Sequence, residues 1–287
     1  MKRSKGSNPV IARTETALAP HEPDLTDPVE VRRAIRAGRF TSFTNTVAHG
    51  YVQGNLVIVP AKYAGNFEDY CRKNPRPCPL LGVSEPGSPR IPALADDMDL
   101  RTDVGEYRIF RDGTAIGTAT DIRDLWRGDF VAFVLGCSFS FEQELINAGV
   151  RLRHIDEGSV SPMYVTSIDT LPAGEFDGKL VVSMRGLRPS DAIRAVEITS
   201  RFPKFHGAPV HIGKPEMIGV ELDRPYGGHG LTELRDDELP VFWACGATAQ
   251  AALERAQLPI AITHSRAHML VTDRKSEDFI VSYPPPR

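Results

Sequence analysis

The hydrophobic residues of this chain fall into short runs, and most of the runs have the length of a β-strand. Phe130–Gly136 is apolar throughout, and Asn55–Val59 and Val241–Cys245 are similar. Ile260–Thr263 and Met269–Thr272 follow near the end of the chain. Unbroken apolar runs of this length are typical of strands that are buried on both faces of a sheet. The pattern therefore predicts a sheet covered by helices.

Helix signals lie between these strands. Asp27 is a candidate N-cap, Pro28 suits the first helical position, Glu30 suits a capping box, and Gly38 ends the segment. Asp112-Gly113 predicts a hairpin turn after a strand within Leu100–Asp112. Helices are also predicted over Tyr63–Lys73, Asp121–Trp126, Phe141–Ala148, Pro189–Arg201 and Ala249–Ala256.

The pattern changes between residues 151 and 205. Short alternating segments there, Leu152–Ile155, Met163–Ser167 and Lys179–Met184, predict strands ahead of a single helix. Asn74–Pro92 is rich in proline and is predicted to be irregular but ordered.

These elements predict an α/β fold, with a mixed sheet flanked by helices and a smaller inserted α+β subdomain. Residues 28–150 and 206–287 form the predicted core domain, and 151–205 the inserted subdomain. Residues 1–27 lack an apolar period and are predicted to be a disordered tail.

Composition narrows the class of protein. The formal net charge is −3 and no long basic run occurs, so nucleic acid is not an expected partner. No apolar run approaches the roughly 18–20 residues that span a bilayer, and no secretory signal is recognisable, so we expect a cytoplasmic protein without a membrane partner. The four cysteines form no C-x-x-C pair, so we expect free thiols and no metal. Association of identical chains is left open.

Two segments share one design, in which an apolar strand ends in cysteine and small or hydroxyl residues then open a helix. They are Val134–Glu142 and Phe242–Thr248. Ligands of α/β sheets bind beyond strand ends, where helix N-termini attract carboxylates. The candidate residues are Cys137, Ser138, Ser140, Cys245, Gly246 and Thr248. The alternative is plain N-capping by the hydroxyls and two buried thiols.

Other candidates come from residue type. One of His206, His211, His264 or His268 suits a general acid or base, because imidazole titrates near neutral pH. Arg185 or Arg201 suits a clamp for a substrate carboxylate. Cys137 or Ser138 is a candidate nucleophile, although no G-x-S-x-G elbow surrounds them. Nucleotide-binding fingerprints are absent from the sequence, so no cofactor is expected.

Several motifs together resemble one family, and they are spread from about residue 28 to about residue 275. They include His49–Leu56, Arg76–Leu81, Glu85–Pro89, Leu135–Glu142, Arg153–Ile155, Pro162–Tyr164, Ser183–Arg185, Ile198–Pro203, His206–Gly213, Phe242–Gly246 and Ile262–Leu270. The chain is identified by them as a member of the hydro-lyase family, also called the D-glutamate cyclase family.

The resemblance implies a carbon–oxygen lyase that acts on a small carboxylate with loss of water. The reaction for which the family is named is cyclisation of D-glutamate to 5-oxo-D-proline. Two alternatives are kept: a non-catalytic protein that binds a small carboxylate, and a lactam or amide hydrolase that acts on 5-oxoproline-like substrates through Cys137 or Ser138.

Overall fold

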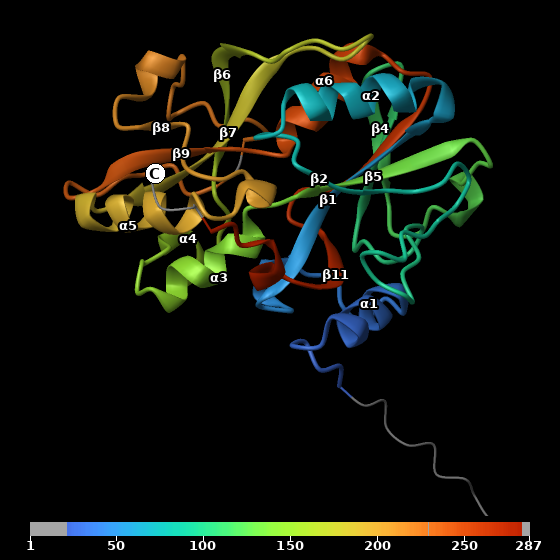
Figure 1. The fold of residues 1–287 in the computed structure, drawn as a ribbon, viewed down its shortest axis with the longest axis horizontal. Coiled ribbons are helices and arrows are strands. Elements are labelled where there is room, and N and C mark those ends of the chain that lie inside the picture. The colour runs from blue at the N-terminus through green and yellow to red at the C-terminus, as the bar shows by residue number, and fades with distance from the viewer. Residues whose placement is uncertain (1–21, 229, 283–287) are drawn as a thin grey trace, which may run out of the picture.

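The computed structural model describes residues 22–228 and 230–282. Two sheets lie side by side in Figure 1. The seven-stranded sheet, called sheet A here, lies on the right with helices α1 and α2, and the four-stranded sheet, called sheet B, lies on the left with helices α3, α4 and α5. The helices are α1 (Pro28–Arg36), α2 (Ala61–Lys73), α3 (Phe139–Asn147), α4 (Arg153–Asp156), α5 (Pro189–Thr199) and α6 (Ala247–Ala256). Short 3-10 turns are η1 (Thr44–Thr46), η2 (Arg123–Leu125), η3 (Pro203–Phe205), η4 (Pro215–Ile218) and η5 (Ser276–Phe279).

Sheet A has the order β2-β5-β1-β10-β3-β4, and β11 pairs with β1. Its strands are β1 (Tyr51–Pro60), β2 (Leu80–Val83), β3 (Tyr107–Arg111), β4 (Thr114–Ala119), β5 (Phe130–Gly136), β10 (Ala261–His264) and β11 (Leu270–Lys275). The neighbouring strands run antiparallel. The predicted hairpin turn is confirmed, because Asp112 and Gly113 both have positive φ, 47° and 74°.

Sheet B has the order β6-β7-β9-β8, again antiparallel. Its strands are β6 (Met163–Asp169), β7 (Lys179–Leu187), β8 (His211–Ile212) and β9 (Leu239–Ala244). The segment 151–205 supplies β6 and β7, while β8 and β9 come from later in the chain. That 151–205 is an inserted subdomain stays a prediction.

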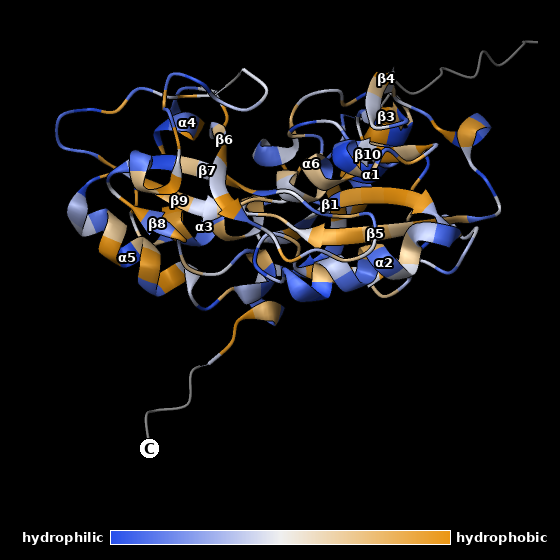
Figure 2. Ribbon diagram, turned by 90° about the horizontal axis from the view of Figure 1, so that it is seen from above, coloured by the Kyte–Doolittle hydropathy of each residue, from blue (hydrophilic) through white to orange (hydrophobic). Residues whose placement is uncertain are grey.

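The central strands explain why their sequences are apolar without alternation. Val57 and Phe133 belong to one core of sheet A, and Ile58 and Val134 belong to the core on the opposite face. Neighbouring residues of β1 and β5 thus point into different cores, and the strands appear orange along their length in Figure 2. The predicted α/β fold with flanking helices is confirmed.

Some local predictions were wrong. Leu152–Ile155 was expected to be a strand, but Arg153–Asp156 forms helix α4, because four residues are too few for alternation to decide. The segment 74–92 was expected to be irregular, but it contains the strand β2. Of the helix expected over Asp121–Trp126, only the 3-10 turn η2 forms. Asp27 caps α1 as predicted, since its side chain accepts the N–H of Val29.

Residues 1–21 of the predicted tail, 1–27, lie outside the described residues. In the part of the chain that the structure describes, no helix combines the length and apolar character needed to cross a bilayer.

Candidate active site

The two strand–cysteine–helix segments open onto one cavity. β5 continues through Cys137 and Ser138 into α3, and β9 continues through Cys245 and Gly246 into α6. Both cysteines, together with Ser138, line a cavity of about 80 Å³. Two helix N-termini, each with its partial positive charge, therefore face the same small space.

The thiols sit at matching positions in the two turns. The backbone N–H of Phe139 favours the thiolate form of Cys137, and that of Ala247 favours the thiolate form of Cys245, but burial outweighs both. Burial raises the pKa of the Cys137 thiol to about 12 and also raises the pKa of Cys245. At neutral pH both groups are thiols, and neither is a ready nucleophile.

The hydroxyls predicted as N-caps have other partners. Ser140 Oγ accepts the N–H of Gln53 at 3.0 Å, which ties α3 to β1. Thr248 Oγ1 accepts the N–H of Val181 at 3.0 Å, which ties α6 to β7. Neither α3 nor α6 has a side-chain cap. The capping interpretation of Ser138, Ser140 and Thr248 was therefore wrong, because strands distant in sequence take up these hydroxyls.

A buried charged cluster stands behind the cavity. Arg185 Nε lies 3.1 Å from Glu142 Oε1, and His154 Nε2 lies 3.1 Å from the same oxygen. Burial would raise the pKa of Glu142, but Arg185 and His154 outweigh it and hold that pKa at about 2. The Glu142 carboxylate is therefore ionised, and it neutralises the guanidinium of Arg185.

Arg185 also reaches two serines that line the cavity. Its Nη2 donates to Ser138 Oγ at 3.0 Å, and its Nη1 donates to Ser183 Oγ at 3.2 Å. The side chain of Arg185 is almost wholly buried, so it acts on the cavity through these hydroxyls.

The rest of the polar lining comes from Asn55, Ser161, Gln250, His264 and Arg266. Arg266 Nη2 donates to the Ser161 carbonyl at 2.8 Å, and burial lowers the pKa of this arginine, which is still a cation at neutral pH. Ser161 Oγ is buried and has no hydrogen-bond partner among the described residues. This hydroxyl is therefore able to hydrogen-bond a ligand in the cavity.

His264 is neutral at physiological pH, because burial lowers its pKa to about 4. Its Nδ1 lies 3.1 Å from the backbone nitrogen of Leu56 and 3.3 Å from the Leu56 oxygen. If Nδ1 donates to that oxygen, Nε2 is a base; if Nδ1 accepts from the nitrogen, Nε2 is a donor. A ligand in the cavity would therefore meet Nε2 in a role set by the tautomer.

A close approach joins the two sheets beside the cavity. A Cβ atom built on Gly246 would lie 2.4 Å from the side chain of Asn55, which is far inside van der Waals contact. Asn55 Nδ2 in turn donates to the Gly136 carbonyl at 2.7 Å. Gly246 thus lets the α6 turn rest directly on β1, and Asn55 links both turns.

Four other candidates from the sequence do not line the cavity. Arg201 is exposed, and His211 Nε2 lies 2.7 Å from the Lys214 carbonyl. His206 is buried against the Arg76 carbonyl at 2.7 Å, and burial lowers its pKa to about 4. His268 packs against the ring of Phe43. None of the four is among the residues that line the cavity.

Sequence reasoning missed Arg266, Ser183 and Ser161 as site residues. A signal existed for Arg266, since it stands between His264 and His268 just after a strand. As for metals, no group of three or more potential ligands among His, Cys, Asp and Glu occurs within residues 22–228 and 230–282.

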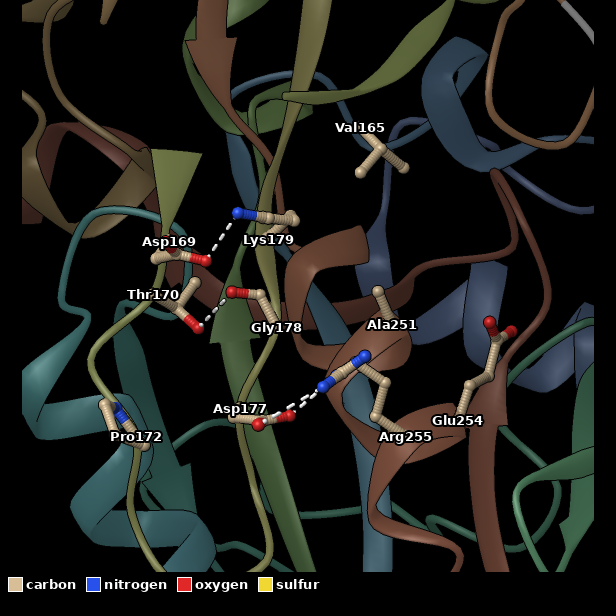
Figure 3. A pocket seen from close by; sticks show the side chains of 10 residues that line it. All are labelled: Val165, Asp169, Thr170, Pro172, Asp177, Gly178, Lys179, Ala251, Glu254 and Arg255. Carbon is tan, nitrogen blue, oxygen red and sulfur yellow. Dashed lines mark hydrogen bonds and ion pairs between the residues drawn. The ribbon is translucent and has the colours of Figure 1, made fainter. Parts of the chain in front are cut away.

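A wider hollow of about 560 Å³ lies elsewhere, between β6, β7 and α6 (Figure 3). Most of its charged groups pair with one another: Lys179 pairs with Asp169, and Arg255 pairs with Asp177, both at 2.6 Å, while Glu254 faces Arg108 at 3.8 Å. The side chains of the first two pairs are exposed, and they leave little charge to recognise a ligand. The smaller cavity is therefore the stronger candidate for an active site.

Comparison with known proteins places the chain in a family. A family model described as D-glutamate cyclase matches residues 131–273, which include both turns of the cavity. A "Putative hydro-lyase" of Verminephrobacter eiseniae is 53% identical over 267 residues, covering 92% of this chain and 97% of that protein. Proteins of the same name from Bordetella petrii and Xanthobacter autotrophicus are 52% and 50% identical, each over 88% of this chain and over 96% and 92% of their own lengths. The prediction made from the motifs is confirmed, and the chain belongs to the hydro-lyase family that is also called the D-glutamate cyclase family.

Proposed function

We propose that the cavity is the active site of a lyase that removes water from a small acidic substrate, and that it cyclises D-glutamate to 5-oxo-D-proline. One observation carries the proposal: two uncapped helix N-termini, those of α3 and α6, open onto the same cavity. Such termini stabilise a bound carboxylate, and Arg266 in the lining adds a cation.

Each candidate role has a group in the lining. Arg266 and the N-terminus of α6 hold the α-carboxylate of the substrate. His264, neutral at pH 7, accepts a proton from the substrate ammonium group and later delivers it to the departing oxygen. Such proton transfer typically contributes about 100- to 10,000-fold to a rate.

The reaction balances without another reactant. The amine nitrogen of glutamate forms a bond to its side-chain carboxyl carbon, and one carbon–oxygen bond of that carboxyl group breaks. The oxygen of the released water comes from the side-chain carboxylate, and both of its hydrogens come from the ammonium group. The enzyme therefore has to move protons and hold the two ends of the substrate together.

The test is to incubate purified protein with D-glutamate, L-glutamate and 5-oxo-D-proline and to follow each by proton NMR. We expect 5-oxoproline to form from D-glutamate, and we expect His264→Gln to slow it by about 100-fold or more. The matched control is His49→Gln, because His49 is exposed and outside the cavity, and it should keep wild-type turnover.

The alternatives give different results. Shifted ligand signals without turnover would identify a carboxylate-binding protein instead of an enzyme. Hydrolysis of 5-oxo-D-proline that is lost in Cys137→Ser would identify a lactam hydrolase with a thiol nucleophile. The raised pKa of Cys137 favours the lyase over this last reading.

A further inference from the structure

The two serines that Arg185 contacts have a forced hydrogen-bond direction. A guanidinium group offers donors and no acceptor, so Ser138 Oγ and Ser183 Oγ both accept from Arg185. Each hydroxyl hydrogen must then point toward a different acceptor. Within the described residues neither hydroxyl donates to a protein acceptor.

Both hydroxyls belong to the cavity lining, and both serines are buried, with 8% and 4% of their surface exposed. A buried O–H without an acceptor is unfavourable. The acceptor is therefore expected in the cavity, where a ligand oxygen can receive two converging hydrogen bonds. Ser138 comes from the α3 turn and Ser183 from β7, so two different elements each bring one hydroxyl to the cavity, and one guanidinium group holds both.

The two serines differ from Arg266 in the net charge of the group to which they belong. Glu142 neutralises Arg185, so the two hydroxyls donate from a cluster with little net charge. A full carboxylate gains more from Arg266, whereas a carbonyl oxygen that becomes negative during reaction gains most from fixed, neutral donors. The subsite thus suits an oxyanion that exists only transiently.

We propose that Ser138 and Ser183 form an oxyanion site for the side-chain carboxyl group of the substrate, an assignment that rests on the proposed cyclisation. As the amine attacks, the carbon–nitrogen bond forms and the carbonyl electron pair moves onto the oxygen that the two serines hold. His264 carries one ammonium proton to the carboxylate oxygen that will leave, which makes that oxygen a hydroxyl. When the electron pair returns, the carbon–oxygen bond breaks, and the hydroxyl leaves as water with the second proton from the nitrogen, again carried by His264. Arg185 is a positioning residue here, and Glu142 and His154 fix its orientation.

The experiment measures kcat and KM for D-glutamate in Ser138→Ala, Ser183→Ala and the double variant. Each single change should lower kcat by about 100- to 1,000-fold and leave KM within about threefold, because the donors act in the transition state. The double variant should lose less than the product of the two single losses, since the serines act on one oxygen.

Two further variants separate the hydroxyl from its structural setting. Ser183→Thr keeps a hydroxyl on a strand residue and should restore kcat to within about tenfold of wild type, whereas a purely structural serine would show no such recovery over alanine. Ser84→Ala is the matched control: Ser84 is buried and its Oγ accepts the Ala132 N–H at 2.9 Å, away from the cavity. It should melt at a lower temperature but keep its kcat.

The outcomes are distinct. Wild-type protein that forms no 5-oxoproline overturns the proposed function and this assignment together. Wild-type turnover with kcat within threefold in both alanine variants overturns the oxyanion site alone, and so does a loss confined to KM. If an alanine variant does not fold, as judged by circular dichroism, a folded Ser183→Thr that loses kcat more than 100-fold overturns the assignment as well.

Discussion

The wide hollow and the small cavity differ in what their polar groups are doing. The hollow of Figure 3 has about seven times the volume of the cavity, about 560 Å³ against about 80 Å³, yet its charges are spent on exposed ion pairs such as Arg255–Asp177. The cavity is lined by buried hydroxyls, of which Ser161 Oγ has no hydrogen-bond partner among the described residues, and two helix N-termini without side-chain caps open onto it. Size alone is therefore a poor guide to chemistry, and unsatisfied buried groups are a better one.

The largest expected effect comes from removing the cation behind the cavity. Arg185→Met leaves Glu142 buried without its guanidinium partner, and we expect the free energy of unfolding to fall by about 3–5 kcal/mol. Urea denaturation at pH 7 measures it. Arg255→Met removes an exposed pair of the same kind in the wide hollow and is the control. An equal loss of unfolding free energy in the two variants would contradict the difference proposed between the cavity and the wide hollow.

A smaller effect follows from pH. The pKa values of His206 and His264 are lowered to about 4, so between pH 6.5 and pH 4 the unfolded chain binds protons that the folded chain does not. Stability should therefore fall as pH falls through this window, by about 1.4 kcal/mol per pH unit for each histidine. The free energy of unfolding at a series of pH values tests this.

His206→Asn removes one contribution, because asparagine tolerates the positive φ of 76° at this position. The slope between pH 6.5 and pH 5 should become shallower by up to about 1.4 kcal/mol per pH unit, and the remaining slope belongs to His264 and to His268, whose pKa burial also lowers. An unchanged slope in His206→Asn would show that His206 titrates normally. Glu142 has a pKa of about 2 in the folded protein, so its protonation changes the stability only below pH 4.5 and does not affect the slope in this range.

The smallest effect is expected in the wide hollow itself. Lys179→Ala and Arg255→Ala each remove one partner of an exposed ion pair, and each should change the free energy of unfolding by less than about 1 kcal/mol. Formation of 5-oxoproline from D-glutamate should remain within twofold of wild type. A large loss of turnover in either variant would indicate that the active site lies in this hollow and not in the cavity.

Local pattern predicted the strands better than it predicted the partners of their polar neighbours. Phe130–Gly136 was predicted with its observed bounds, because both of its faces are buried and its apolar run is unbroken. The capping alternative for Ser140 and Thr248 was wrong, since the partners of these hydroxyls, Gln53 and Val181, lie 87 and 67 residues away. No local pattern encodes such contacts.

The same limit applies to the candidate site. The two cysteine turns were found in the sequence because each repeats a strand-to-helix signal, and the structure brings both to one cavity. Arg185 and Arg201 were equivalent in sequence, but one is buried behind Ser138 and the other is exposed. Arg266 follows β10, and the pairing of β10 with β1, a contact between distant parts of the chain, brings this residue to the cavity.

The contact between Gly246 and Asn55 has a consequence for how this chain can vary. Any single-base change that alters a glycine codon to another amino acid introduces at least a Cβ atom, and at residue 246 that atom would collide with Asn55. Because Asn55 is buried and its Nδ2 donates to the Gly136 carbonyl, a side chain at residue 246 would require that Asn55 give up this hydrogen bond, that residue 55 become shorter, or that the α6 turn shift. Substitution at residue 246 is thus coupled to residue 55 in the other sheet.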